Sequence, residues 1–253
     1  MSFQSNRGVI LYSPDESGMC IEMKSVTKKY DAIPALNGID MEIPWGARYS
    51  LIGPNGAGKS TTLKILVGLL KPDGGSVKIG GFDPVTNDAK RIIGYLPEDA
   101  YPYINLTLTE NLEYIGAIRG VEDPKSRAAE LIQKLDLVPY RFTKVSQLSR
   151  GNRQKLSVAL AIVHHPKVIL LDEPLNYLDI PTQASVIKML DELKATYLVS
   201  THIMEIAEKL SRNVIIIGHG KVTWNGTMDD LRNMARGSER IEEVVARLMT
   251  DVA

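Results

Sequence analysis

The run GPNGAGKS at residues 53–60 fits the phosphate-binding pattern G-x-x-x-x-G-K-[ST] at every fixed position. The residues before it, 49–52, read as a short buried strand. Apolar residues after it recur at helical spacing, at Leu63, Leu66, Val67 and Leu70. A loop between a strand and a helix directs backbone N–H groups and the helix N-terminus at an anion. This context predicts a site for the phosphates of a nucleotide.

The residue types within this run suit phosphate chemistry. We expect glycines to keep side chains away from the phosphate oxygens, Lys59 to reach the β- and γ-phosphates, and Ser60 to ligate Mg²⁺. The alternative is a glycine-rich turn that binds nothing, and the flanking strand and helix argue against it. The predicted nucleotide-binding residues of the loop are Gly53, Pro54, Asn55, Gly56, Ala57, Gly58, Lys59, Ser60 and Thr61.

A second run, VILLDEP from residue 168, has the features of the other half of such a site. Four apolar residues followed by Asp172 predict a buried strand that delivers a carboxylate to Mg²⁺ at its C-terminal end. Glu173 follows at once and is placed to accept a proton from an attacking water or to orient it. The alternative is a strand that ends in two solvated acids, which is less plausible behind a phosphate loop.

Strands and helices alternate after residue 167, which predicts a parallel sheet buried on both faces. Residues 20–80 favour strands, with turns expected at Asn37-Gly38 and at residues 72–75. Residues 105–165 favour helices, one of which begins at Asp123-Pro124. We therefore expect an α/β fold. It comprises a P-loop NTPase core with a mixed, mainly parallel sheet, an N-terminal antiparallel β subdomain and an inserted helical subdomain.

These patterns also predict where the chain divides. We expect a flexible N-terminal extension at residues 1–19 and a nucleotide-binding domain at residues 20–230, with its helical subdomain at about 99–165. A C-terminal helical extension is expected at residues 231–253. Within it, residues 239–250 have the apolar spacing of an amphipathic helix, which either covers the core or contacts a second subunit.

Composition narrows the class of protein. The chain has 253 residues, 44% hydrophobic and 24% charged, which is ordinary for a globular protein. A formal net charge of zero gives no electrostatic reason to expect a nucleic-acid partner. The single cysteine, Cys20, excludes internal disulfides and cysteine-cluster metal sites, and indicates a reducing compartment. No apolar run approaches the ~18 residues that a membrane span needs, and the N-terminus lacks an apolar signal core.

Taken together, the motifs resemble those of the ATP-binding subunits of ABC transporters, from about residue 20 to 227. LSRGN at residues 148–152 is similar to that family's signature LSGGQ and opens a predicted helix before VILLDEP. The resemblance implies that Tyr30 stacks on adenine, that Asp179 lies in the D-loop, and that His202 contacts the γ-phosphate. The resemblance thus extends the set of predicted nucleotide-binding residues by five: Tyr30, Ser149, Gly151, Asn152 and Asp179.

The resemblance implies further roles. Glu98 in GYLPE occupies the position where many members have glutamine, and we expect it near the metal. The predicted catalytic residues are Glu173, His202 and Lys59, and the predicted metal ligands are Ser60, Glu98 and Asp172. Some of these residues also have a purely structural interpretation. Tyr30 could be an aromatic residue at a strand end, and His202 a capping or core histidine. Ser149 and Gly151 could simply cap a helix. His164, His165 and His219 match no motif, and we expect them to be structural or solvated.

The chain departs from the commonest family pattern at a few positions. Arg150 and Asn152 replace Gly and Gln in the signature, and the shorter Asn152 puts its contacts across a dimer in question. Tyr177 replaces a small residue just before Leu178-Asp179, where a bulky side chain would alter the path of the loop if a positive φ is required. Glu98 in place of glutamine adds negative charge near Mg²⁺.

The function implied is that of the ATP-hydrolysing subunit of a transporter, with ATP and Mg²⁺ as its cofactors. Two chains, in a homodimer or with a paired ATPase subunit, would sandwich ATP head to tail and drive a separate membrane permease. GYLPE looks like the export-type subgroup, and residues 99–104 are the expected docking segment. We expect the chain to be cytoplasmic and peripheral on the inner face of the cell membrane.

Other functions compete with this one. A soluble ABC-type ATPase acting on the ribosome or DNA is the main alternative, although such relatives usually carry two ATPase domains or a long coiled coil. A regulator with an inactive site is opposed by Lys59, Asp172, Glu173 and His202. A GTPase is disfavoured because no N-K-x-D guanine-reading motif occurs.

Overall fold

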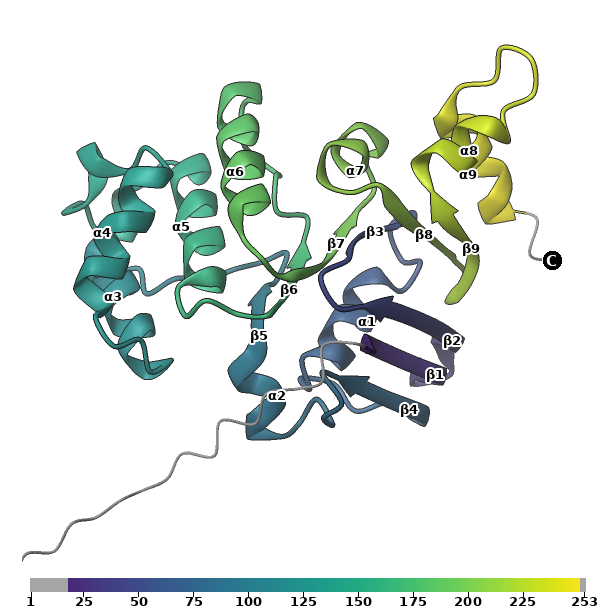
Figure 1. The fold of residues 1–253 in the computed structure, drawn as a ribbon, viewed down its shortest axis with the longest axis horizontal. Coiled ribbons are helices and arrows are strands. Elements are labelled where there is room, and N and C mark those ends of the chain that lie inside the picture. The colour runs from purple at the N-terminus through teal and green to yellow at the C-terminus, as the bar shows by residue number, and fades with distance from the viewer. Residues whose placement is uncertain (1–17, 251–253) are drawn as a thin grey trace, which may run out of the picture.

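The computed structural model describes residues 18–250 (Figure 1). Of the extension expected at residues 1–19, residues 1–17 lie outside the described residues, and Met19 already belongs to the first strand.

A mixed sheet forms the centre of the molecule, with strand order β5-β6-β7-β3-β8-β9. The five strands from β5 to β8 in this order run parallel, and β9 is antiparallel to β8. The bounds are β3 Arg48–Ile52, β5 Ile93–Leu96, β6 Val168–Asp172, β7 Thr196–Thr201, β8 Asn213–Gly218 and β9 Lys221–Thr227. The expected mainly parallel sheet is confirmed.

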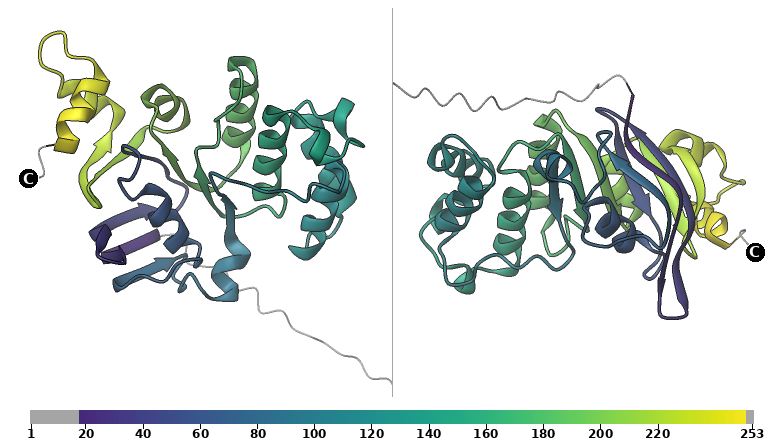
Figure 2. Two further views of the ribbon diagram at one scale, coloured as in Figure 1. Left: turned by 180° about the vertical axis from the view of Figure 1, so that it is seen from behind. Right: turned by 90° about the horizontal axis from the view of Figure 1, so that it is seen from below.

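The two faces of this sheet bury different sets of side chains. Along β6, Val168 and Leu170 pack with α1 and the N-terminal strands, whereas Ile169 and Leu171 pack with the helices on the other face. Continuous apolar strands can therefore be fully buried, because alternate side chains enter separate cores. Helices α1 Lys59–Leu66, α6 Ile180–Glu192 and α7 Met204–Leu210 contribute to these layers (Figures 1 and 2).

Helix α1 is shorter than the apolar pattern indicates. It ends at Leu66, Val67 is its C-cap, and Gly68 adopts a left-handed conformation with φ 71°. Leu63, Leu66 and Val67 are buried as expected, but Leu70 lies beyond the helix. The glycine ends the helix because it alone adopts this backbone conformation at no steric cost.

A separate antiparallel sheet, in the order β2-β1-β4, holds the N-terminal residues. Its strands are β1 Met19–Tyr30, β2 Ile33–Pro44 and β4 Gly74–Ile79. The turn expected at Asn37-Gly38 is wrong: these residues lie within β2, and the chain reverses at Asp31. Gly38, with φ 80°, is skipped in the pairing between Thr27↔Asn37 and Val26↔Ile39, so the glycine forms a β-bulge.

Helices α3 Leu108–Ile118, α4 Pro124–Lys134 and α5 Arg150–Ile162 gather at the end of the molecule away from β1 and β2 (Figure 1). The predicted start at Asp123-Pro124 is confirmed, since the Asp123 side chain caps α4 and Pro124 occupies its first turn. Short 3₁₀ turns at Val138–Tyr140 and Val145–Gln147 connect α4 to α5. A further helix, α2 Asn87–Ile92, precedes β5.

The chain continues beyond β9 as α8 Met228–Asn233 and α9 Ile241–Thr250. Val244 and Val245 of α9 are buried in a cluster with Met204 and Ile216. The amphipathic helix therefore covers the chain's own core, which was one of its two predicted roles.

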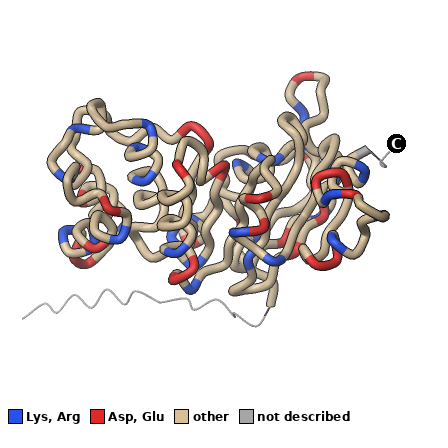
Figure 3. The backbone as a smooth tube through the Cα atoms, turned by 90° about the horizontal axis from the view of Figure 1, so that it is seen from above, with Lys and Arg blue, Asp and Glu red and all other residues tan. Residues whose placement is uncertain are grey.

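Charge and hydropathy add two observations on the described residues. Figure 3 shows Lys and Arg interspersed with Asp and Glu along the tube. Within residues 18–250, none of the helices is both long and apolar enough for a membrane crossing.

Candidate nucleotide site

The phosphate loop leaves β3, the strand between β7 and β8, and enters α1. Two of its glycines are required by close packing. A Cβ on Gly53 would lie 2.4 Å from the Ile217 carbonyl oxygen, and a Cβ on Gly58 would lie 2.7 Å from the Ala35 carbonyl oxygen. Gly58 is also the N-cap of α1, with φ 106°. The loop can pass this close to its neighbours only because these residues lack side chains.

Lys59 begins α1 and its side chain turns back into the loop. The ammonium donates to the carbonyls of Gly53, at 2.7 Å, and Pro54, at 3.1 Å. Burial lowers the pKa of Lys59, while the nearby carboxylates of Glu173, Asp172 and Glu98 act in the opposite direction. The Lys59 ammonium is thus held within the phosphate loop, close to three carboxylates.

A cavity of about 350 Å³ opens beside the loop. It brings together residues from the small sheet, the phosphate loop and the ends of β5 and β6. Its lining consists of Tyr30, Ala35, Asn55, Gly56, Gly58, Lys59, Ser60, Thr61, Glu98, Asp172 and Glu173. Most of the predicted loop residues border it, whereas Gly53, Pro54 and Ala57 are not part of the lining.

Asp172 is placed by the register of the parallel sheet. It ends β6, is 2% exposed, and lies opposite Ser200 of β7, whose hydroxyl donates to its carboxylate. Since the carboxyl ends of parallel strands meet at one edge, Asp172 and the loop after β3 reach the same cavity.

The Glu173 carboxylate is held by three donors. Thr201 donates from Oγ1 at 3.1 Å and His202 from its backbone N–H at 3.0 Å, while His202 Nδ1 lies 2.6 Å from Glu173 Oε1. The Glu173 backbone is left-handed, with φ 49°, an uncommon conformation for a residue with a side chain. The carboxylate is therefore fixed at the cavity wall, and His202 contacts Glu173 without lining the cavity.

Tyr30 and Glu98 reach the cavity from outside the loop. Tyr30 ends β1, lines the cavity beside the phosphate loop and is 48% exposed, so an aromatic surface is available there. Glu98 follows β5 and is also exposed. Tyr30 and Glu98 are therefore both accessible to a ligand that enters the cavity from solvent.

The oxygen atoms at this cavity suit a hard divalent cation. Ser60, Glu98 and Asp172 supply a hydroxyl and two carboxylates, the ligand types that Mg²⁺ takes in nucleotide sites. The described residues contain no cluster of three or more His, Cys, Asp or Glu that would hold a metal alone. This donor set fits an ion that completes its coordination with phosphate oxygens and water.

Four of the predicted nucleotide-binding residues lie elsewhere. Ser149 caps α5 and accepts from the Asn152 backbone N–H at 3.2 Å, and Asp179 caps α6 and accepts from Thr182 at 3.0 Å. The side-chain and backbone hydrogen bonds that Asp179 accepts from Thr182 lower its pKa. Neither these residues nor Gly151 lines the cavity. One chain thus carries two separate parts of the predicted site.

Sequence reasoning missed several residues that support the site. Ala35 lines the cavity, and Ser200 and Thr201 hold the two carboxylates. A signal for Ser200 and Thr201 is present in the sequence, since the two residues directly precede His202 at the end of an apolar run. Gln154 donates to the Pro174 carbonyl at 2.9 Å, and only the packing of α5 reveals this contact.

A phosphate loop on a parallel sheet, with a strand-end carboxylate pair at the same cavity, defines a P-loop nucleotide hydrolase. The family model described as ABC transporter matches residues 36–176, and the chain belongs to this family.

Relatives within the family point the same way. The daunorubicin/doxorubicin resistance ATP-binding protein DrrA of Streptomyces peucetius is 35% identical, over 84% of this chain and 67% of that protein. The linearmycin resistance ATP-binding protein LnrL of Bacillus subtilis (strain 168) is 30% identical, over 89% of this chain and 75% of that protein.

Solved structures support both fold and activity. An ATP binding subunit of an ABC transporter superposes with a TM-score of 0.83 at 29% identity, covering 90% of this chain and 99% of that chain. The dimeric post-hydrolysis state of the ATP-binding cassette MJ0796, bound to ADP and Pi, has a TM-score of 0.76 at 29% identity, covering 82% and 98%. The chain is an ATP-binding subunit that hydrolyses ATP with Mg²⁺, and the non-transport alternative is not favoured.

Proposed function

We propose that the cavity beside the phosphate loop holds ATP and that Glu173 activates the water that attacks the γ-phosphate. The observation that carries this assignment is the fixed carboxylate of Glu173, which three donors hold at the wall that it shares with Lys59 and Ser60. A carboxylate in this position accepts the proton of the attacking water or orients that water.

The other residues of the cavity divide the remaining work. Lys59 stabilises charge on the β- and γ-phosphates, and Tyr30 stacks on adenine. Ser60, Asp172 and Glu98 would hold Mg²⁺, which would supply positive charge against the negative charge of the phosphates. His202 orients Glu173 through the 2.6 Å contact of its Nδ1, and its other ring nitrogen, Nε2, would make the predicted contact with the γ-phosphate.

The separate residues at the start of α5 and α6 supply the second half of a composite site. Ser149, Gly151, Asn152 and Asp179 would meet the nucleotide of a second copy, which explains their distance from the chain's own cavity. The N-terminus of α5, a helix of 13 residues, offers backbone N–H groups to a phosphate. The dimeric structure of a related cassette supports such pairing.

Replacement of Glu173 by glutamine tests this assignment. Glu173→Gln keeps the shape of the side chain but replaces one acceptor oxygen by an amide donor and removes its basicity. We expect it to bind ATP as the parent does and to hydrolyse it about 10²-fold more slowly or worse. The variant should also accumulate an ATP-bound dimer in size-exclusion chromatography. Turnover close to that of the parent would contradict the assignment.

The relatives' names suggest the direction of transport. Two of them are described as resistance proteins for daunorubicin/doxorubicin and linearmycin. By analogy, the chain works at the inner face of the cell membrane and drives a permease that exports its substrate.

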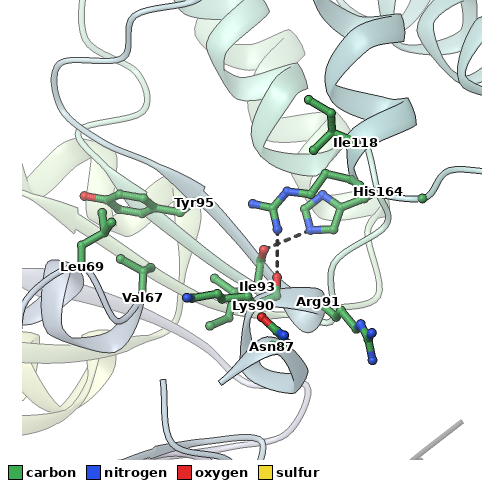
Figure 4. Close-up of a pocket in the computed structure, with 11 residues that line it drawn as sticks. Val67, Leu69, Asn87, Lys90, Arg91, Ile93, Tyr95, Ile118 and His164 are labelled. Carbon is green, nitrogen blue, oxygen red and sulfur yellow. Dashed lines mark hydrogen bonds between the residues drawn. The ribbon is translucent and has the colours of Figure 1, made fainter. Parts of the chain in front are cut away.

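A groove next to the segment 99–104 has the features of a permease-docking site. It measures about 680 Å³ and lies between the end of α1, α2, β5 and the end of α3 (Figure 4). Leu69 and Ile118, 70% and 61% exposed, present apolar surface, while Lys90 and Arg91 add positive charge. A hollow lined by residues 100–103 adjoins it and shares Tyr95 and Arg119 with it.

Two buried polar atoms in this groove have no hydrogen-bond partner among the described residues. Burial raises the pKa of Tyr95 to about 12, so its hydroxyl keeps a proton to donate. Burial and nearby Arg119 lower the pKa of His164 to about 4, so the ring is neutral. Its Nε2 donates to the Ile93 carbonyl at 3.0 Å, which leaves Nδ1 as an acceptor. These two atoms are buried behind the exposed lining, so the complementarity of a docked segment rests on acidic and apolar side chains that match Lys90, Arg91, Leu69 and Ile118.

Charge reversal in the groove tests the docking proposal. We expect Lys90→Glu with Arg91→Glu to abolish co-purification with the tagged permease partner of this subunit, without loss of ATP turnover by the isolated subunit. Lys221→Glu, at an exposed position on β9, is the matched control. Undiminished capture of the doubly reversed variant would contradict docking at this groove.

A further inference from the structure

Two of the chain's departures from the family pattern touch each other. Arg150, the first residue of α5, lies over the ring of Tyr177, with Cζ 3.2 Å from the ring centroid. Tyr177 belongs to the loop between β6 and α6. The contact therefore joins the signature segment to the loop that begins with Glu173.

Tyr177 is held in an unfavourable backbone conformation. Its φ is 67°, in the left-handed region where a bulky side chain is rare. Glu173 is also left-handed, with φ 49°, and the two residues bracket a turn closed by the Asn176 N–H to the Glu173 carbonyl, at 3.2 Å. A change in the backbone at Tyr177 would therefore reach Glu173 through a single short turn.

Strained residues persist only where their surroundings fix them. The backbone of this turn packs against α5: a Cβ on Gly151 would lie 3.3 Å from the Tyr177 carbonyl oxygen, and Gln154 donates to the Pro174 carbonyl. Tyr177, however, is 52% exposed, and the guanidinium of Arg150 is the group that stacks on its ring. Arg150 forms no ion pair within the described residues, and its guanidinium is paired with the Tyr177 ring.

We propose that Arg150 is a positioning residue for hydrolysis: its stacking on Tyr177 stabilises the left-handed tyrosine and so keeps the turn that carries Glu173 in its working orientation. A guanidinium stacks on an aromatic face with both planar and electrostatic complementarity. This inference rests on the proposed catalytic role of Glu173.

The proposal makes opposite predictions for alanine and glycine at position 177. Tyr177→Ala keeps the strain but removes the stacking partner, and Arg150→Ala removes the guanidinium. Each should lower kcat about fivefold to tenfold with little change in KM for ATP, the scale expected for one strained residue. Tyr177→Gly should retain the parent's kcat, because glycine adopts this φ without strain.

The decisive variant combines two changes. In Arg150→Ala with Tyr177→Gly, the strain that Arg150 offsets is gone, so kcat should return to near the parent's value. Arg150→Lys, which keeps the charge but not the planar group, should give an intermediate rate. Arg141→Ala is the matched control, since it removes another exposed arginine stacked on an aromatic ring, Phe142, away from this turn. It should leave kcat unchanged.

Two results would overturn the inference: parental kcat in Arg150→Ala, or a defect in Arg150→Ala that glycine at position 177 does not relieve. The second result would mean that Arg150 acts directly, for instance on a phosphate. Glu173→Gln is measured alongside, so that the two claims can fail separately. Normal turnover in Glu173→Gln refutes the role of Glu173, whereas an inactive Glu173→Gln beside an unaffected Arg150 series refutes only the positioning role. Melting temperatures of all variants separate misfolding from a loss of kcat.

Discussion

The side chains at the cavity carry more negative than positive charge. Lys59 is surrounded by Asp172, Glu173 and Glu98, and a nucleotide brings further negative charge to the same place. Like charges that share one cavity repel unless a cation lies between them. The lining itself therefore accounts for the need for Mg²⁺ with ATP.

Glu98 is the member of this set whose contribution is easiest to isolate. A carboxylate binds a hard cation better than an amide does, but it repels the γ-phosphate when no metal is present. We expect Glu98→Gln to bind ATP more tightly than the parent in EDTA, and to need more Mg²⁺ for half-maximal hydrolysis. Titrations of ATP with and without Mg²⁺ measure both effects. If neither quantity changes, Glu98 lies outside the metal shell.

We expect Tyr30 to contribute to ATP affinity by stacking on the base. Every purine offers a flat π-surface, so stacking gives little discrimination between bases. Tyr30→Ala should weaken the binding of ATP and GTP alike, by about 1–3 kcal/mol. Tyr30→Phe retains the ring and serves as the control, with affinity close to the parent's. Unchanged ATP affinity in Tyr30→Ala would show that the ring has a structural role only.

At the scale of elements, α9 stabilises the edge of the molecule beside β8 and β9. It covers a cluster that includes Met204, Val214 and Ile216, with Val244 and Val245 as its buried contribution. Burial of such side chains is worth about 1.5–3 kcal/mol each.

Deletion from Ser238 onward should therefore lower the melting temperature of the monomer, because the cluster on β8 and α7 loses its cover. Thermal unfolding at low protein concentration, without nucleotide, measures this effect. The matched control is Arg240→Ala, which changes an exposed residue at the start of α9. An unchanged melting temperature combined with loss of ATP-dependent dimerisation would assign the helix to the dimer contact instead.

How far the sequence predicts these elements depends on whether the signal is local. The strand–loop–helix around Lys59 and the cap at Asp123 were predictable because adjacent residues specify them. The turn predicted at Asn37-Gly38 was wrong, because a glycine in the left-handed conformation suits a β-bulge as well as a hairpin turn. The limits of 20–230 and about 99–165 for the predicted domains stay a prediction.

The residues that line the cavity were largely predictable from the sequence, whereas the contacts that hold those residues in place were not. Asp172 and Glu173 followed from a strand-end motif, and Tyr177 drew attention because its loop in the family favours a small residue. The contact of Tyr177 with Arg150 depends on how α5 packs against the loop after β6, and no local pattern encodes that.

At the scale of the whole molecule, we treat one chain as one of two subunits that act together. The residues around Lys59 and those around Ser149 lie at different places on one subunit, and we propose that a complete site needs two copies arranged head to tail. This arrangement is the central claim of our account, and it predicts that two defective subunits can repair each other.

Complementation between two inactive variants tests that claim most directly. Lys59→Ala loses the phosphate-loop half, and Ser149→Arg loses the signature half. Each alone should be inactive. In a 1:1 mixture, half of the dimers pair one copy of each and contain one intact site of two, so ATPase activity should recover to about a quarter of the parent's. A mixture that hydrolyses ATP no faster than the two variants measured separately would contradict the shared site.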